Sequence, residues 1–85
     1  MKQYTKTYLK YFGYCETDII LCEVCGLRAV DIHHIEARKK RKDLENDINN
    51  LMALCRDCHH ELGDRKQFKE YLHELHKTKL QTVER

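Results

Sequence analysis

The sequence contains no long apolar run, no internal repeat and no low-complexity linker. A membrane helix needs about 20 consecutive apolar residues, so no membrane partner is expected. The first residues are too polar for a secretory signal. Hydrophobic residues make up 41% and charged residues 35% of the 85 residues, a balance typical of folded chains and unlike that of disordered ones. We therefore expect one small, soluble, intracellular domain spanning residues 1–85.

Proline and tryptophan are also absent, whereas there are five cysteines. Ordering a chain costs roughly 1.5 kcal/mol per residue, which a core this small barely offsets. Domains near this size are therefore often stabilised further by disulfide bonds or a bound metal ion. Four cysteines form two C-x-x-C pairs, Cys22 with Cys25 and Cys55 with Cys58. Without an export signal, paired cysteines are metal ligands more often than disulfides. Cys15 is left over and is expected to be a small, half-buried hydrophobe.

The two pairs match a tetrahedral four-cysteine zinc site, with Zn–S bonds of about 2.3 Å. The usual gap between such pairs is roughly 15–20 residues. Here the gap is residues 26–54, which leaves room for a hairpin. A redox C-x-x-C would need a thioredoxin-like βαβ context, which this sequence lacks. The pattern therefore predicts a structural Zn²⁺ whose binding free energy contributes to folding.

Three stretches have the periodicity of helices. Residues 1–14 carry aromatic side chains at helical spacing before a glycine. A second helix is expected to start near Cys55 and to run through Cys58 to Gly63, and Asp64 could cap a last helix over residues 64–79. The apolar faces of the first and last helices are expected to point into the core. These faces comprise Tyr4, Tyr8 and Phe12 in the first helix, and Phe68, Tyr71, Leu72 and Leu75 in the last.

Two stretches between the cysteine pairs have the composition of strands. Residues 28–35 are rich in β-branched side chains, and residues 51–54 form a short apolar run. The polar residues 36–49 between them read as a loop. This loop contains five consecutive basic residues, Arg38, Lys39, Lys40, Arg41 and Lys42. Along the whole chain, basic segments flank acidic ones, which suits either a nucleic-acid surface around a metal centre or ordinary solvated faces.

Histidines accompany the cysteines. His33 and His34 are adjacent on the predicted first strand, and His59 directly follows the second cysteine pair. A zinc site would bring the two pairs together, so these three histidines are expected to lie close in space. A lone histidine is most often structural, but three converging imidazoles can hold a metal ion or move a proton.

These residues resemble the HNH endonuclease family over residues 20–62, about the middle half of the chain. The resemblance rests on four segments, which are 22–25, 29–35, 50–51 and 54–59. It implies an α+β domain with the ββα-metal (His-Me finger) fold, here stapled by zinc and flanked by N- and C-terminal helices. It also implies metal-dependent hydrolysis of DNA phosphodiester bonds, with nicking favoured by one active site per chain.

The resemblance assigns roles by position. His34 corresponds to the general base that activates water, and a histidine is well suited to this role because its pKa is about 6.5. His33 and His59 correspond to ligands of a catalytic divalent ion such as Mg²⁺ or Mn²⁺. Asn50 corresponds to the residue that fixes the hairpin loop and orients the base. Some family members have a third metal ligand where this chain has Gly63, so the ion is expected to be weakly held.

We also assign expected roles to other polar residues in and beyond this motif. Asp31 could orient a metal ligand, or could be a solvated strand carboxylate. His60 is expected to be structural or to face phosphate, and His73 and His76 are expected on a solvent-exposed helix face. The five basic residues of the loop are expected to contact the phosphate backbone with little sequence preference.

An alternative is a zinc-stapled module that binds nucleic acid or a protein partner without turnover. Under this alternative the cysteines would matter and His34 would not. Small standalone HNH proteins resemble those of phages and mobile elements, some of which assist genome packaging. The resemblance therefore also allows a protein partner such as a larger nuclease or packaging complex, and a location in a host's cytoplasm.

Overall fold

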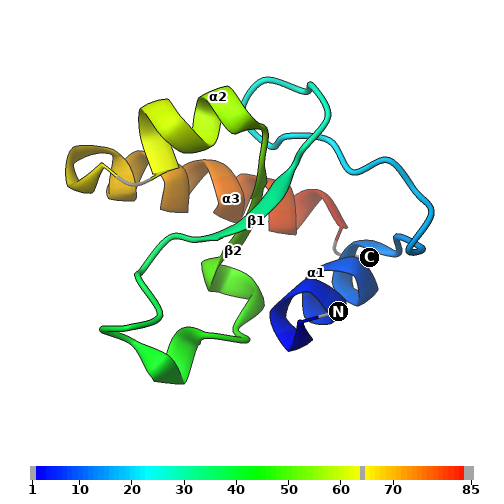
Figure 1. Cartoon of the computed structure of the whole chain (residues 1–85), viewed down its shortest axis with the longest axis horizontal. Helices are drawn as coiled ribbons and strands as arrows, with labels where there is room; N and C mark the ends of the chain where they lie inside the picture. Colours follow the sequence, from blue (N-terminus) through cyan, green and yellow to red (C-terminus); the bar gives the residue numbers. More distant parts are fainter. Residues whose placement is uncertain (1, 64, 84–85) are drawn as a thin grey trace.

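A computed structural model of the chain describes the structure of residues 2–63 and 65–83. Its centre is a hairpin of two antiparallel strands, β1 (Asp31–His34) and β2 (Leu51–Leu54). Figure 1 shows this hairpin with helices around it. They are α1 (Gln3–Phe12), α2 (Arg56–Cys58), which continues as a π-helical turn over His59–Gly63, and α3 (Lys69–Val83). The predicted α+β class and the ββα-metal arrangement are confirmed.

Strand β2 is buried on both of its faces, because α1 covers one and α3 covers the other. Its four side chains have no exposed surface. Successive side chains of a strand point to opposite faces, so Leu51 and Ala53 pack with Tyr8 of α1, whereas Met52 and Leu54 pack in a cluster that contains Leu72 of α3. This double cover explains why a four-residue strand can hold the domain together.

The first predicted strand is shorter than expected. Residues 28–35 were predicted to form one strand, but β1 begins at Asp31. The residues before it fold back on the chain that leads to the first cysteine pair. Leu21 and Arg28 form an antiparallel bridge, and the Cys22 N–H donates to the Leu27 carbonyl at 2.6 Å. The tight turn between the first two cysteines forces this reversal, and Gly26 supports it with a φ of 80°.

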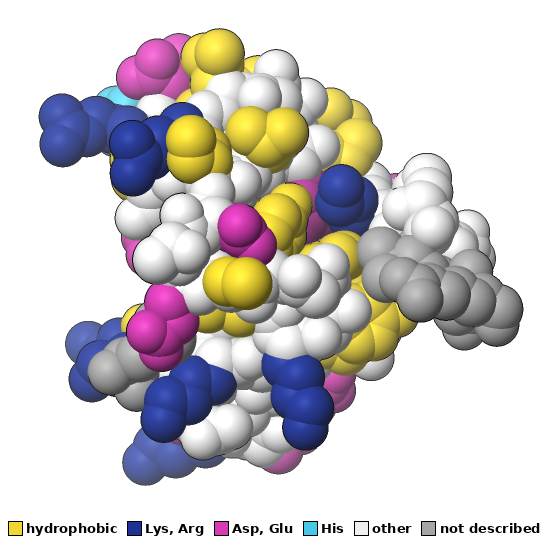
Figure 2. Space-filling view, turned by 90° about the vertical axis from the view of Figure 1, so that its right-hand side faces the viewer, with side chains coloured by type: hydrophobic (Ala, Val, Ile, Leu, Met, Phe, Trp, Pro, Cys, Tyr) yellow, Lys and Arg dark blue, Asp and Glu magenta, His cyan; other side chains and the backbone are white. Residues whose placement is uncertain are grey.

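Residues 19–30 thus form a ribbon that doubles back at the first cysteine pair, and one face of this ribbon is open to solvent. Figure 2 shows that hydrophobic side chains are interspersed with charged ones on the side of the molecule where the ribbon lies. Four apolar side chains from the ribbon have half or more of their surface exposed. They are Ile19, Leu21, Leu27 and Val30.

Helix α1 ends where predicted. Gly13 takes a left-handed conformation with a φ of 75°, and the Tyr14 N–H donates to the Leu9 carbonyl at 2.8 Å. This is a common way for a helix to stop, because glycine has no Cβ to clash in that conformation. In the predicted stripe, Tyr8 is fully buried, whereas Tyr4 and Phe12 are partly buried.

The burial of His76, Tyr71 and Cys15 differs from the expectation. His76 was expected at the surface, but its side chain is only 1% exposed, because the buried face of α3 runs through Leu72, His76 and Leu80. Tyr71 was expected in the core and is 49% exposed on another side of that helix. Cys15 is exposed, in the turn that follows α1. The proposed cap Asp64 lies outside the described residues. Within the described ranges, no helix has the length and apolar character needed to cross a bilayer.

Candidate metal centre and histidine cavity

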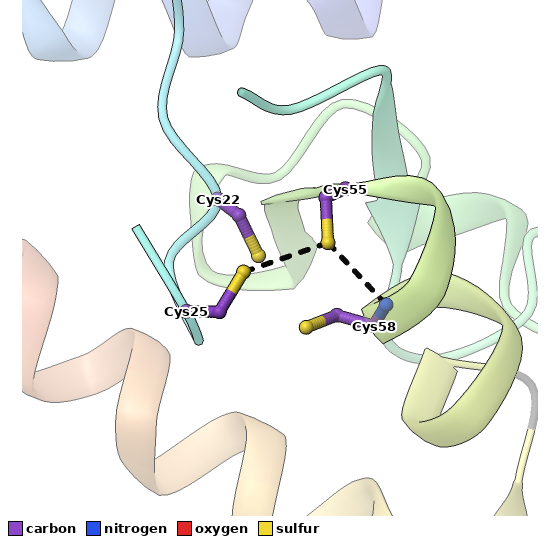
Figure 3. Close-up of side chains that lie close together, drawn as sticks. All are labelled: Cys22, Cys25, Cys55 and Cys58. Carbon is purple, nitrogen blue, oxygen red and sulfur yellow. Dashed lines mark hydrogen bonds between the residues drawn. The ribbon is translucent and has the colours of Figure 1, made fainter. Parts of the chain in front are cut away.

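The four paired cysteines converge on one point (Figure 3). Cys22 and Cys25 come from the ribbon, and Cys55 and Cys58 come from the start of α2. Their sulfur atoms all lie within 4.8 Å of one another. The Cys25 and Cys55 sulfurs are 3.5 Å apart, much farther than a disulfide bond of about 2.05 Å. Four converging thiols are the donor set of structural zinc sites, so the chemistry of the donors fits Zn²⁺.

The backbone around the cluster favours thiolate at one position. Burial alone would raise the pKa of Cys22, but backbone N–H groups, foremost that of Cys25, outweigh it and lower this pKa to about 7. Burial raises the pKa of Cys58, and hydrogen bonding with the neighbouring thiols raises it further. A bound dication would offset this cost, because metal-bound thiols are deprotonated.

The predicted histidines lie together in a separate open cavity. It has a volume of about 270 Å³ and is lined by His33 and His34 of β1 and by His59. Asp31, Tyr4 and Arg38 also line it. His59 directly follows Cys58, so the same short turn supplies the last thiol of the metal cluster and one imidazole of the cavity.

Two of these imidazoles form a pair. The ring centroids of His33 and His59 are 4.8 Å apart. On the outer side of the pair, Nδ1 of His59 lies 3.0 Å from a carboxylate oxygen of Asp31. An ionised carboxylate can only accept a hydrogen bond, so this contact places a proton on Nδ1 of His59. Metal-binding histidines are commonly oriented by such a carboxylate on the opposite ring nitrogen.

Gly63 forms the wall behind this pair. A Cβ placed there would lie 2.6 Å from Cδ2 of His59 and 3.4 Å from Nε2 of His33. The position therefore faces both imidazoles, as a third metal ligand would, but glycine contributes no donor. The tight fit keeps the backbone of the π-helical turn in contact with the two rings.

His34 points to a different anchor. Its Nε2 lies 2.9 Å from the backbone carbonyl oxygen of Glu45. A carbonyl only accepts, so Nε2 carries the proton in this contact. In the neutral ring the lone pair is then on Nδ1, which is the form that can accept a proton. An aromatic ring also contacts His34, because Tyr4 of α1 lies edge-to-face at a centroid distance of 4.5 Å.

Asn50 fixes the loop that carries this anchor. Its side chain is buried, and its Oδ1 accepts from the Glu36 N–H at 2.6 Å. Its Nδ2 donates to the carbonyls of Glu36 at 3.1 Å and of Leu44 at 3.2 Å. Leu44 directly precedes Glu45, so the amide of Asn50 holds the turn that presents the Glu45 carbonyl to His34. The side chain of Asn50 is not among those lining the described part of the cavity.

The basic run contributes one residue to the cavity. Arg38 lines it, and its guanidinium lies 5.5 Å from the ring centroid of Tyr4. Within the part of the chain that the structure describes, the other basic residues of the run are exposed and lie outside the cavity lining. Arg41 is paired with Asp43, at 3.0 Å. His60 is also exposed and outside the lining.

Sequence reasoning missed a buried network beside the metal cluster. The carboxylate of Glu23, between the first two cysteines, accepts from the Tyr8 hydroxyl at 2.5 Å and from the Ala53 N–H at 3.2 Å. Nδ1 of His76 lies 2.7 Å from the same carboxylate, and its Nε2 lies 2.7 Å from the Ile48 carbonyl. Both ring nitrogens thus face acceptors, the arrangement of an imidazolium paired with a carboxylate. The spacing of His76 from Leu72 and Leu80 could have revealed its burial.

A second missed contact joins the hairpin loop to α3. The carboxylate of Glu36 lies 3.1 Å from Nζ of Lys69 and 3.0 Å from Nε2 of His73. Hydrogen bonds from His73 and then Lys69 hold the pKa of Glu36 below its usual value. His73 is therefore a half-buried partner of the loop, where a surface residue was predicted.

Comparison with known proteins agrees with this arrangement. No curated protein and no solved structure matches the chain. The family model described as HNH endonuclease matches residues 22–65. This stretch is more than half of the 85 residues, and it contains both cysteine pairs and all three histidines of the cavity. The chain therefore belongs to the HNH endonuclease family.

Proposed function

We propose that this protein hydrolyses DNA phosphodiester bonds, with His34 as the general base. The observation that carries the proposal is the hydrogen bond from Nε2 of His34 to the Glu45 carbonyl. It fixes the tautomer in which Nδ1 has the lone pair, on a ring that lines the same cavity as the paired imidazoles of His33 and His59. A base of this type takes a proton from water as the water attacks phosphorus, and such help is typically worth about 100- to 10,000-fold in rate.

His33 and His59 are the residues that would hold a divalent ion. Imidazole nitrogens suit divalent transition metals, and the carboxylate of Asp31 on Nδ1 of His59 is the kind of outer contact that orients a metal ligand. When bound, the ion would polarise the scissile phosphate and stabilise the departing oxygen. Because Gly63 supplies no further donor, we expect weak binding and tolerance of several ions, including Mg²⁺ and Mn²⁺.

The remaining residues of the cavity would hold the substrate and the base in place. Arg38 can donate to non-bridging phosphate oxygens, since guanidinium groups match phosphate geometry. Asn50 holds the turn that anchors His34. With one such cavity among the described residues, we expect nicking of one strand in each event.

The test is conversion of supercoiled plasmid to open circles with a panel of divalent ions, comparing wild type with His34→Ala. His60→Ala is the matched control, because His60 directly follows His59 in the π-helical turn but does not line the cavity. We expect His34→Ala to lose at least 100-fold in rate and His60→Ala to stay near wild type, with equal zinc content in all three. If His34→Ala cleaves as fast as wild type, the assignment of the base is wrong. If wild type binds DNA but fails to cleave it with every ion in the panel, the chain is a binding module.

A further inference from the structure

Tyr4 lines the histidine cavity although it lies outside the stretch that matches the family. It belongs to α1, which begins at Gln3 and packs against both strands of the hairpin (Figure 1). The periodicity of α1 predicted Tyr4 as a core residue together with Tyr8. In the structure Tyr8 is 1% exposed at the centre of the cluster with Leu51 and Ala53, whereas Tyr4 packs at the edge of that cluster, is partly exposed and also lines the cavity.

Two contacts of Tyr4 involve residues of the proposed mechanism. Its ring meets the imidazole of His34 at a centroid distance of 4.5 Å and an interplanar angle of 74°. This edge-to-face geometry is the favoured one for aromatic pairs. The guanidinium of Arg38 lies 5.5 Å from the same ring centroid, within cation–π range.

Glu45 completes a closed set of contacts with these residues. The carbonyl of Glu45 accepts from His34 at 2.9 Å, and its carboxylate lies 4.0 Å from the Arg38 guanidinium. Arg38 in turn lies over Tyr4, and Tyr4 packs against His34. The hydrogen bond to Glu45 fixes one atom of the imidazole but leaves the ring free to swing about that bond. The ring of Tyr4 restricts this swing.

We infer that Tyr4 is a positioning residue that holds the His34 imidazole, and with it Arg38, in the orientation needed for attack on phosphate. The inference rests on the proposed function, since it concerns how the proposed base is aimed. It makes α1 part of the active site, although the family match begins at Cys22. Displacing a reacting group by about 1 Å can cost about 100-fold in rate, so one well-placed ring has a measurable effect.

The kinetic test compares Tyr4→Leu, Tyr4→Phe and Tyr11→Leu. Tyr4→Leu removes the ring, Tyr4→Phe keeps it, and Tyr11→Leu removes a ring from the same helix away from the cavity. We expect Tyr4→Leu to lower kcat about ten- to a hundredfold, with a smaller change in KM. Tyr4→Phe and Tyr11→Leu should stay within about threefold of wild type. A Tyr4→Leu enzyme with normal kcat, or a Tyr4→Phe enzyme as slow as Tyr4→Leu, would overturn the inference.

A second test does not depend on cleavage. NMR of the zinc-loaded wild type should show a nuclear Overhauser effect between the ring protons of Tyr4 and His34. The His34 ring-proton shifts should be displaced by the neighbouring ring in wild type and Tyr4→Phe, and should relax toward ordinary values in Tyr4→Leu. If wild type lacks the Overhauser effect, Tyr4 does not hold His34. If wild type shows it but cleaves no DNA, the proposed function fails while the packing of Tyr4 on His34 stands.

Discussion

Replacement of Gly63 by alanine should separate catalysis from folding. A Cβ at this position would lie 2.6 Å from Cδ2 of His59, and 3.3 Å from Cε1 of His33. Carbon atoms in contact sit about 3.5–4.0 Å apart, so His59 has to move by about 1 Å. A shift of that size at a reacting centre can cost about 100-fold in rate. We therefore expect Gly63→Ala to cleave about 100 times more slowly and to need more divalent ion.

The stability of the same variant should change little. Gly63 is not among the glycines with positive φ, so alanine brings no backbone strain. Replacing a helical glycine by alanine by itself raises the free energy of unfolding by about 0.5–1 kcal/mol. Gly13→Ala is the matched control with the opposite profile. A Cβ placed at Gly13 would meet no packed neighbour within 4 Å, but the φ of this residue is 75°. We therefore expect Gly13→Ala to lose about 1–2 kcal/mol in stability and the folded protein to cleave normally.

The assay is plasmid nicking as a function of Mn²⁺ concentration, with urea unfolding and zinc content measured on the same samples. If Gly63→Ala cleaves at the wild-type rate and with the wild-type metal requirement, the position of His59 does not limit catalysis. The assignment of His59 as a metal ligand would then fall. If Gly63→Ala is instead unfolded at the temperature of the assay, the packing argument underestimates the rigidity of this turn.

Three further predictions concern stability. Cys55→Ser should lose the zinc and unfold the domain, because binding of a structural metal contributes directly to folding; a folded, zinc-free variant seen by circular dichroism and metal analysis would contradict this. His76→Ala should cost about 3–5 kcal/mol in urea unfolding, because it leaves the carboxylate of Glu23 buried without its partner, and a cost below 1 kcal/mol would refute the pairing. The pKa of Glu36 is lowered by His73 and then Lys69. The stability that the ionised Glu36 side chain contributes is therefore complete above the unfolded-state pKa of about 4.3, and it is lost as the pH falls through the lower folded-state pKa. Glu36→Gln should therefore flatten the acid side of the stability–pH curve while changing little of its shape above pH 6.

Much of the fold was predictable because short-range patterns and the cysteine pairs act together. The spacing of Cys22, Cys25, Cys55 and Cys58 requires the two ends of the hairpin to meet, and the hairpin then brings His33 and His34 near His59. The alternation along β2 follows from the period of a strand. These constraints follow from residue types and their spacing along the chain, so they can be read directly from the sequence.

The remainder depends on which elements pack together, and no local pattern encodes that. The spacing of His76 from Leu72 and Leu80 hints at burial, but only the placement of α3 shows that its ring meets Glu23 and Ile48. The shortening of β1 follows from the turn at Gly26, which draws residues 28–30 into the ribbon. Tyr4 has the same spacing as a core residue, and only the position of α1 relative to the cavity shows that it reaches His34.

The adjacency of Cys58 and His59 has a consequence for how sequences of this kind can vary in length. The two residues belong to different centres, but one peptide bond joins them. Insertion of a single residue between them would turn His59 by about 100° around the helix, away from Asp31 and His33. Residues 39–42 of the hairpin loop lie outside the cavity lining, and loops tolerate added length at little entropic cost. Natural and engineered insertions should therefore accumulate in that loop and be absent from the junction of Cys58 and His59.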